Sequence, residues 1–175
     1  MSNLHNPSFL RNALSLGRDL KNHLTLNGVP IGVPLDDVMP ACQGDPKAAK
    51  ALCHGPVRGP WASVDVYGFW EGEAFDGKPF VPNMRAHMNA DATLIRMVDV
   101  HIDPSAGLPV LFALYDGLGM PDSMSKWAVE WNTQDGIVFL MNTCGCITLA
   151  IASASAPSSD EEECASQAAL LALAA

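Results

Sequence analysis

The chain has 175 residues, of which 49% are hydrophobic and 17% charged, and its formal net charge at pH 7 is −9. These values exclude a disordered chain, which needs low hydrophobicity, and they fit one domain with a tail. The acidic balance and the scattered lysines and arginines also argue against a nucleic-acid partner, because binding to phosphates needs clustered cations.

The ends and the cysteines bear on location. The first residues, MSNLHNPSFLRN, contain no basic segment followed by an apolar run, and no apolar stretch reaches the roughly 20 residues of a membrane helix. We therefore expect a cytoplasmic protein with no membrane partner. Five cysteines stand at positions 42, 53, 144, 146 and 164. An odd number without a secretion signal favours free thiols, although Cys42 and Cys53 could pair in an oxidising compartment.

Residues 1–60 are predicted to be helical or loop. Asn6-Pro7 has the form of a helix start, and apolar residues then recur at helical spacing as far as Leu24, before Asn27-Gly28 ends the helix. A segment with three prolines follows and is expected to be loop. A second helix should begin at Asp45-Pro46 and end near Gly55.

From Trp61 onward the pattern changes to the two-residue period of strands. Turn signals separate the segments, and their short connections favour antiparallel neighbours. The predicted strands are 61–67, 68–75, 79–82, 84–90, 93–102, 109–115, 126–132, 136–142 and 146–153. The sequence therefore predicts a single α+β domain over 1–153, with N-terminal helices followed by a curved antiparallel sheet or a meander β-barrel over 61–153. Residues 154–175, acidic and then alanine-rich, are expected to form a flexible tail.

Trp70 stands between two glycines in the segment Gly68-Phe69-Trp70-Glu71-Gly72. Such glycines in a strand suggest a bend where the ring packs. The triplet, together with the strand meander, resembles the first-strand motif of lipocalin-like (calycin) proteins, in which the tryptophan closes one end of a barrel. Helices followed by a curved sheet are also similar to the nuclear-transport-factor-2-like cone, which houses dehydratases, isomerases and cyclases. Both folds host binders and enzymes, so neither resemblance fixes a function.

The segment Asp99-Val100-His101-Ile102-Asp103 contains the best acid–base candidate. Alternate residues of a strand share a face, so Asp99, His101 and Asp103 should point the same way, with Met97 on that face. A neighbouring carboxylate makes an imidazole a stronger base and fixes its tautomer. We interpret His101 as the base and Asp99 as its orienting partner. The alternative is a polar strand end that emerges into solvent before the Asp103-Pro104 turn.

Asp65 and Tyr67 share a strand face with aromatic neighbours. A carboxylate and a phenol in such surroundings could anchor a ligand or transfer a proton, so we predict them as the opposing acid. The alternation also allows Asp65 to face solvent, since Val64 and Val66 lie on the better core face.

The remaining candidates are predicted to line an apolar ligand pocket. Trp127 and Trp131 share one face, where they could stack on a flat ligand or simply belong to the core. Tyr115 offers a hydroxyl at the rim, and His87 could reach the same cavity as His101. The predicted ligand-binding residues are Trp70, His87, Met97, Tyr115, Trp127 and Trp131.

No dinucleotide, nucleoside-triphosphate, zinc-protease or serine-hydrolase motif is present, and Cys144-Gly145-Cys146 has no second paired cluster that would complete a zinc site. We therefore expect neither a metal nor a cofactor. The predicted function is binding of a small hydrophobic molecule, with a cofactor-independent isomerase, lyase (dehydratase) or cyclase as its enzymatic version. The alternative is an interaction protein whose sheet face, with Trp127 and Trp131, forms a homodimer interface.

Overall fold

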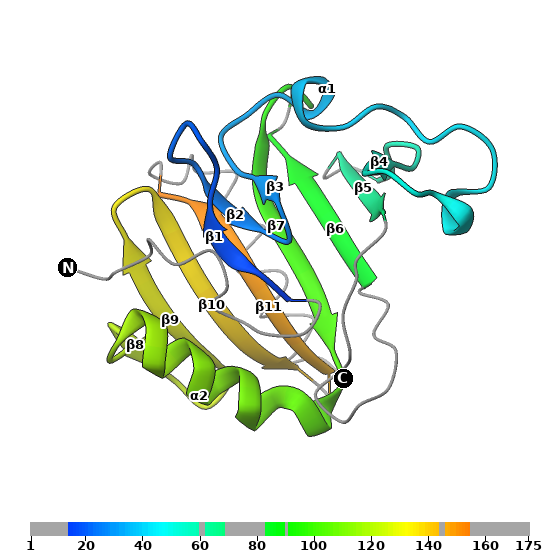
Figure 1. The fold of residues 1–175 in the computed structure, drawn as a ribbon. Helices are drawn as coiled ribbons and strands as arrows, with labels where there is room; N and C mark the ends of the chain where they lie inside the picture. The colour runs from blue at the N-terminus through cyan, green and yellow to red at the C-terminus, as the bar shows by residue number, and fades with distance from the viewer. Residues whose placement is uncertain (1–13, 60–61, 69–82, 90, 144–145, 155–175) are drawn as a thin grey trace.

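The computed structural model describes residues 14–59, 62–68, 83–89, 91–143 and 146–154. Their main element is an antiparallel sheet of eight strands in the order β4-β5-β6-β7-β11-β10-β9-β8 (Figure 1). The strands are β4 (Cys53–His54), β5 (Ser63–Tyr67), β6 (Asn83–Met88), β7 (Ile95–Ile102), β8 (Ser123–Met124), β9 (Ala128–Thr133), β10 (Gly136–Thr143) and β11 (Cys146–Ser153).

The large sheet is open in the part of the chain that the structure describes. β4 and β8 stand at its two ends, and each has one neighbouring strand. A barrel requires the first and last strands to pair, so the closed meander barrel is not found, whereas the sheet-rich α+β class is confirmed. Residues 69–82 and 155–175, which hold Trp70 and almost all of the predicted tail, lie outside the described residues.

A small three-stranded sheet replaces the helix predicted for the first segment. Its strands are β1 (Leu16–Arg18), β2 (Leu24–Leu26) and β3 (Val29–Pro30). The chain turns at Asn22 and Asn27, whose φ values of 71° and 50° are left-handed, a conformation that asparagine tolerates. The leucines of β1 and β2 are fully buried, whereas Leu20, in the turn between these strands, is fully exposed. The predicted helix is therefore wrong from residue 14 onward, and residues 1–13 lie outside the described residues.

The second predicted helix is reduced to a short 3-10 turn, η1 (Pro46–Ala48), which follows the four-residue helix α1 (Leu35–Val38). Asp45 caps η1 as expected, because its side chain accepts a hydrogen bond from the backbone N–H of Lys47 at 3.0 Å. At Ala49 the backbone is already extended, with φ −63° and ψ 127°. The predicted helix start at Asp45-Pro46 is therefore confirmed, whereas the predicted continuation towards Gly55 is wrong.

A disulfide bond joins Cys42 to Cys53, whose Cα atoms are 4.9 Å apart. The adjoining backbone supports it: the N–H of Cys42 donates to the carbonyl oxygen of His54 at 3.0 Å, and Ala41 forms a parallel bridge with His54. The expectation of free thiols is wrong for this pair, because these contacts bring residues 53–54 beside residues 41–42. Disulfides are rare in the cytosol, so the cytoplasmic location stays a prediction that this bond does not support.

The segment predicted as strand 109–115 is instead the helix α2 (Gly107–Leu118), preceded by the 3-10 turn η2 (Pro104–Ala106). Val110 and Leu114 lie one helical turn apart and are fully buried. The opposite side of α2 is also apolar, and Phe112 there is 64% exposed. No polar stripe therefore marks the helical period, which explains why the sequence pattern indicated a strand.

The other strand predictions that fall on described residues agree with the structure to within a few residues. The neighbouring strands are antiparallel as expected, but their order is not a simple meander. β7 pairs with β11, and β8, the next strand along the chain after α2, stands at an edge of the sheet. The matching predictions are 61–67 for β5, 84–90 for β6, 93–102 for β7, 126–132 for β9, 136–142 for β10 and 146–153 for β11.

The small sheet and α2 lie on the same side of the large sheet (Figure 1). Their buried residues form one hydrophobic core with the inward residues of the large sheet. Trp131 on β9 is 2% exposed, and its Nε1 donates a hydrogen bond to the carbonyl oxygen of Gly119 at 2.9 Å. Tyr115 packs edge-on against it, with ring centroids 5.9 Å apart. These contacts fix the C-terminal end of α2 over β9.

The cross-strand register divides the side chains of the large sheet between two faces. One row, buried in the core, consists of Val66, Met84, Val100, Leu149 and Leu140. The next row, on the opposite face, consists of Asp65, Arg85, Asp99, Ala150 and Phe139. We call the face that carries this second row the polar face.

Gly136, the first residue of β10, leaves no room for a side chain. A Cβ atom there would lie 2.5 Å from the carbonyl oxygen of Ala152 and 3.0 Å from Ile31 Cδ1. We expect Gly136→Ala to lower the free energy of unfolding by about 2 kcal/mol in urea denaturation, because the backbone atom cannot move aside. Gly17→Ala is the matched control, since the nearest atom to its added Cβ, Thr25 Oγ1, is 3.9 Å away. Equal losses in both variants would contradict this packing.

Replacing both bridged cysteines, Cys42→Ser with Cys53→Ser, should also destabilise the fold. The two residues are 11 positions apart. The chain-entropy account gives about 3 kcal/mol for a loop of this length, which urea denaturation can measure. Cys146→Ser is the control, because Cys146 is an exposed free cysteine. Alkylation of both Cys42 and Cys53 in the unreduced protein would show that the bond is absent.

Candidate functional site

Polar side chains from neighbouring strands meet near the middle of the polar face. β7 supplies Asp99 and His101, and β6 supplies Arg85 and His87. The register places Arg85 opposite Asp99 and His87 opposite Met97. The predicted shared face is therefore confirmed for Asp99, His101 and Met97. Asp103 does not extend it, because this residue follows β7 and caps η2, where its side chain accepts a hydrogen bond from the backbone N–H of Ser105 at 2.9 Å. With Thr148 of β11, which stands opposite His101, the four polar residues of β6 and β7 form what we call the Asp99 cluster.

Asp99 is the buried centre of the cluster, with a side chain that is only 4% exposed. Its Oδ2 accepts a hydrogen bond from His87 Nε2 at 2.5 Å. Its Oδ1 accepts from Nε and Nη2 of Arg85, both at 3.4 Å. A buried carboxylate needs such partners, because an unpaired one is strongly destabilising. The nearest imidazole to Asp99 is thus that of His87, whereas His101 Nε2 lies 3.8 Å from Oδ1.

His101 is held by two other groups. Its Nε2 lies 2.8 Å from Arg85 Nη2, and its Nδ1 lies 3.2 Å from Thr148 Oγ1. Arginine only donates hydrogen bonds, so Nε2 of His101 must be the acceptor and the ring must be neutral in this arrangement. Its Nδ1–H then donates to Thr148. The lone pair that a general base would use is therefore engaged by Arg85.

His87 is in the opposite situation. Its Nε2–H donates to Asp99, which leaves the lone pair on Nδ1, and that atom has no hydrogen-bond partner among the described residues. The side chain is 21% exposed. A carboxylate that holds one imidazole nitrogen while the other stays available is the arrangement of a general base and its orienting partner. The geometry therefore favours His87 over His101 for that role.

Asp65 and Tyr67 lie on the same face, on the strand next to β6. Asp65 stands opposite Arg85 in the register, but its carboxylate is 3.2 Å from Arg58 Nη1 and forms an ion pair with it. Tyr67 follows two positions along β5 and packs beside Gly55, where an added Cβ would lie 3.3 Å from its ring. Asp65 therefore borders the Asp99 cluster, whereas the Tyr67 ring packs beside Gly55 on the β4 side of β5.

Those aromatic residues of the predicted lining that the structure describes do not join this cluster. Trp131 and Tyr115 belong to the core on the other side of the sheet. Trp127 precedes β9 and is 47% exposed, with the Lys126 ammonium 4.6 Å from its ring centroid. Trp70 lies outside the described residues. The structure thus brings His87, and neither Trp127 nor Trp131, to the acid–base residues.

Three residues of this region were missed in the sequence: Arg58, Arg85 and Thr148. Arg85 could have been found, because it stands two positions before His87 on the predicted strand 84–90 and therefore shares its face. Thr148 and Arg58 gave no signal, since their contacts depend on which strands become neighbours.

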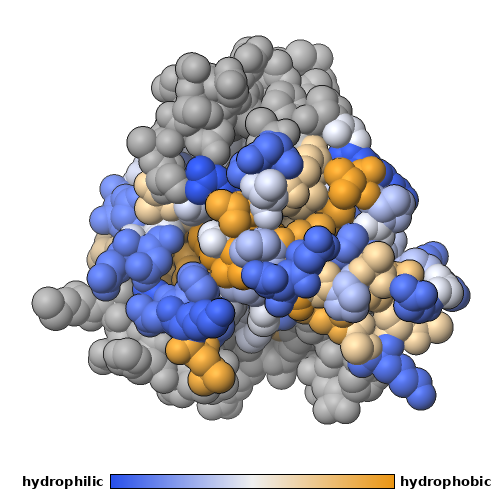
Figure 2. Space-filling model, turned by 90° about the horizontal axis from the view of Figure 1, so that it is seen from above, coloured by the Kyte–Doolittle hydropathy of each residue, from blue (hydrophilic) through white to orange (hydrophobic). Residues whose placement is uncertain are grey.

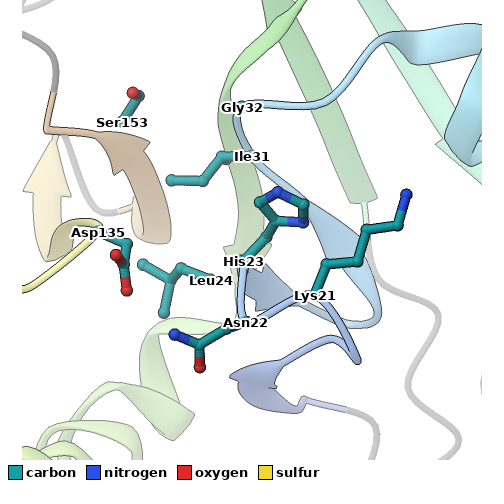
Figure 3. Close-up of a pocket in the computed structure, with 8 residues that line it drawn as sticks. All are labelled: Lys21, Asn22, His23, Leu24, Ile31, Gly32, Asp135 and Ser153. Atoms are coloured by element: carbon teal, nitrogen blue, oxygen red, sulfur yellow. The ribbon is translucent and has the colours of Figure 1, made fainter.

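A cavity of about 200 Å³ lies elsewhere, between the β1–β2 turn and one end of the large sheet, the end that Figure 2 views from above. On the described surface there, hydrophilic residues surround a few hydrophobic ones (Figure 2). The cavity is lined by Lys21, Asn22, His23, Leu24, Ile31, Gly32, Asp135 and Ser153 (Figure 3).

The polar groups of this cavity do not converge on a ligand. Asp135 forms an ion pair with Arg18, and His23 Nδ1 bonds to Asp19 Oδ2 at 2.8 Å. The Lys21 side chain extends away from Asp135 (Figure 3). The Arg18–Asp135 pair therefore joins the small sheet to the large one, whereas the His23–Asp19 bond lies within the β1–β2 turn. The Asp99 cluster is the better candidate site.

Comparisons with known proteins add no family. No protein-family model, curated protein or solved structure matches this chain. Within the described residues, no group of three or more histidine, cysteine, aspartate or glutamate side chains is arranged to hold a metal ion. No helix among them has both the length and the apolar character needed to cross a membrane. The candidate site is therefore argued from its geometry alone.

Asp19 should make the fold sensitive to acid. Burial opposes ionisation of Asp19, but hydrogen bonds from the side chain and backbone of His23 outweigh it and hold the pKa below its usual value. A lowered folded-state pKa stabilises the fold above about pH 4, and this contribution is lost as the pH falls through the folded-state pKa. Asp19→Asn should therefore reduce the loss of stability in acid, measured as urea midpoint against pH. Asp36→Asn is the control, and equal acid profiles for wild type and Asp19→Asn would contradict this account.

Proposed function

We propose that the polar face binds a small, largely apolar molecule and that, in the enzymatic version, the site transfers a proton without a cofactor. The observation that carries this proposal is the buried Asp99 carboxylate, which accepts a hydrogen bond from His87 Nε2 at 2.5 Å. Isomerisation, dehydration and cyclisation reactions need a positioned base in surroundings that exclude water.

His87 is the proposed base. Asp99 holds its Nε2–H, and the negative charge stabilises the imidazolium that forms when Nδ1 takes a proton from the substrate. In an isomerisation, the imidazolium returns the proton to a different carbon atom. In a dehydration, it delivers the proton to the departing hydroxyl, which leaves as water. Each cycle restores neutral His87, so no external acid or oxidant is required.

His101, the base expected from the sequence, receives a positioning role. By accepting a hydrogen bond from Arg85 at 2.8 Å, it fixes the guanidinium group beside Asp99. Arg85 is then placed to donate a hydrogen bond to an oxygen atom of the substrate. Asp65 is engaged by Arg58, so the phenol of Tyr67 is the proposed proton donor on that side.

Apolar side chains continue the polar face beyond the cluster and support a hydrophobic ligand. Met97 precedes Asp99 on β7, and the neighbouring register positions on β11 and β10 hold Ala150, Ala152 and Phe139. Ala150 is fully buried and the other three are partly buried. Apolar surroundings strengthen the electrostatic interactions of the polar groups beside them.

A second candidate function, a homodimeric interaction protein, is favoured by exposed apolar residues on α2 and around β8. Phe112 is 64% exposed, Met124 61% and Trp127 47%. Several such residues on neighbouring elements are typical of interfaces. Native mass spectrometry separates the candidates, because a monomer that retains a small ligand supports the first and an obligate dimer without one supports the second.

Proton transfer can be tested with small ketones in D₂O. The panel contains neutral apolar ketones and ketones with a remote carboxylate, and NMR follows the loss of the α-proton signal. We expect wild-type protein to accelerate exchange for at least one ketone, and His87→Gln to reduce this acceleration by about 100-fold or more, the usual contribution of a general base.

The controls in this experiment separate chemistry from folding. Lys126→Gln, at the far end of the sheet, should exchange like wild type. His87→Gln is expected to lower the thermal midpoint, so exchange is compared at a temperature at which circular dichroism shows each variant to be folded. His101→Gln should reduce exchange less than His87→Gln. Exchange at the uncatalysed rate for the whole panel, or equal rates for wild type and His87→Gln, would overturn the acid–base proposal.

A further inference from the structure

We infer that the ligand carries a carboxylate, which Arg85 binds at the edge of the Asp99 cluster. This inference rests on the proposed function for the position of the site and adds the chemical class of the ligand. It depends on how the charges on the polar face are paired, on which donors of Arg85 are used, and on what surrounds them.

The ion pairs on the polar face differ in the distance between their charged groups. Asp65 is bonded to Arg58 at 3.2 Å, and Asp99 Oδ2 is bonded to His87 at 2.5 Å. The contacts between Arg85 and Asp99 Oδ1 are both 3.4 Å, longer than the roughly 2.7–2.9 Å of a good charge-assisted hydrogen bond. Among these cations, Arg85 therefore makes the longest contacts with its carboxylate partner.

The guanidinium group also has donors to spare. Its Nη2 donates to His101 at 2.8 Å, and the two N–H groups of Nη1 meet no acceptor among the described residues. The side chain is 40% exposed, whereas that of Asp99 beneath it is 4% exposed. A charged donor group that His101 fixes on one side and that is open at Nη1 suits a carboxylate, whose oxygen can accept a charge-assisted hydrogen bond from Nη1–H.

The surroundings favour an apolar body attached to this carboxylate. Beyond Asp99, the row continues through Ala150 to Phe139 before it reaches Glu130 on β9. Glu130 is four strands from Arg85, about 19 Å at the usual strand spacing, so it does not neutralise the guanidinium. A ligand with its carboxylate on Arg85 would contact the partly buried Met97 and Phe139, since Ala150 is fully buried.

Benzoate is a suitable probe, with benzamide as its uncharged counterpart. We expect NMR titration to show benzoate binding to the wild-type protein more tightly than benzamide. Arg85→Gln should weaken benzoate binding about tenfold or more, the usual effect of losing a charge-assisted pair. Arg85→Lys should fall between the two, because lysine keeps the charge and loses the planar geometry.

Lys126→Gln changes the net charge by the same amount as Arg85→Gln and serves as the matched control. Equal weakening by both variants would assign the effect to net charge and overturn the inference. So would equal benzoate affinity in wild type and Arg85→Gln, or no benzoate binding to the wild type. If benzoate binding fails in any of these ways but neutral ketones still exchange, the acid–base proposal survives. If benzoate binds through Arg85 while no ketone exchanges, only the acid–base proposal fails.

Discussion

The pairing of β7 with β11 is the constraint on which the rest of the structure depends. Six residue pairs, from Ile102 with Ile147 to Met97 with Ala152, join the β4–β7 half of the sheet to the β8–β11 half. A shift of one residue would move every side chain of one strand to the other face. Asp99 would then enter the hydrophobic core, and Val100 would leave it. The buried side chains therefore fix the register that places the polar cluster.

That cluster is also a structural requirement. A carboxylate with 4% exposure must have partners, and removing one partner of a buried pair costs about 3–5 kcal/mol. His87 and Arg85 thus stabilise the sheet whether or not a ligand binds. A loss of activity in a variant of Asp99 would not separate these roles. The peripheral groups, the Nδ1 atom of His87 and the Nη1 atom of Arg85, are not needed to satisfy Asp99, and they are where function can be distinguished from stability.

The sequence predicted the second half of the fold better than the first. Residues 98–102 alternate between polar and apolar side chains towards the end of β7, and residues 136–143 and 146–153, which form β10 and β11, are short, mostly apolar runs of strand length. Leucines between residues 14 and 26 fit both a helical and a strand period, and the turn at Asn22 decides for strands. Residues 107–118 are mostly apolar on every side of the helix, so the sequence pattern shows no helical period. Contacts with Trp131 and the sheet determine which side of the helix is buried.

The candidate site shows the same limit at the level of single contacts. Alternation along β7 correctly placed Asp99 and His101 on one face, but it did not predict which histidine the carboxylate would bind. Arg85 determines which histidine pairs with Asp99, because it stands opposite Asp99 in the register. Its Nη2 contacts both Asp99 Oδ1 and His101 Nε2, which lie 3.8 Å apart. Its position depends on the register between β6 and β7, which includes an irregularity at His87. The pattern within one strand therefore predicts which side chains share a face, whereas the neighbouring strand determines how they pair.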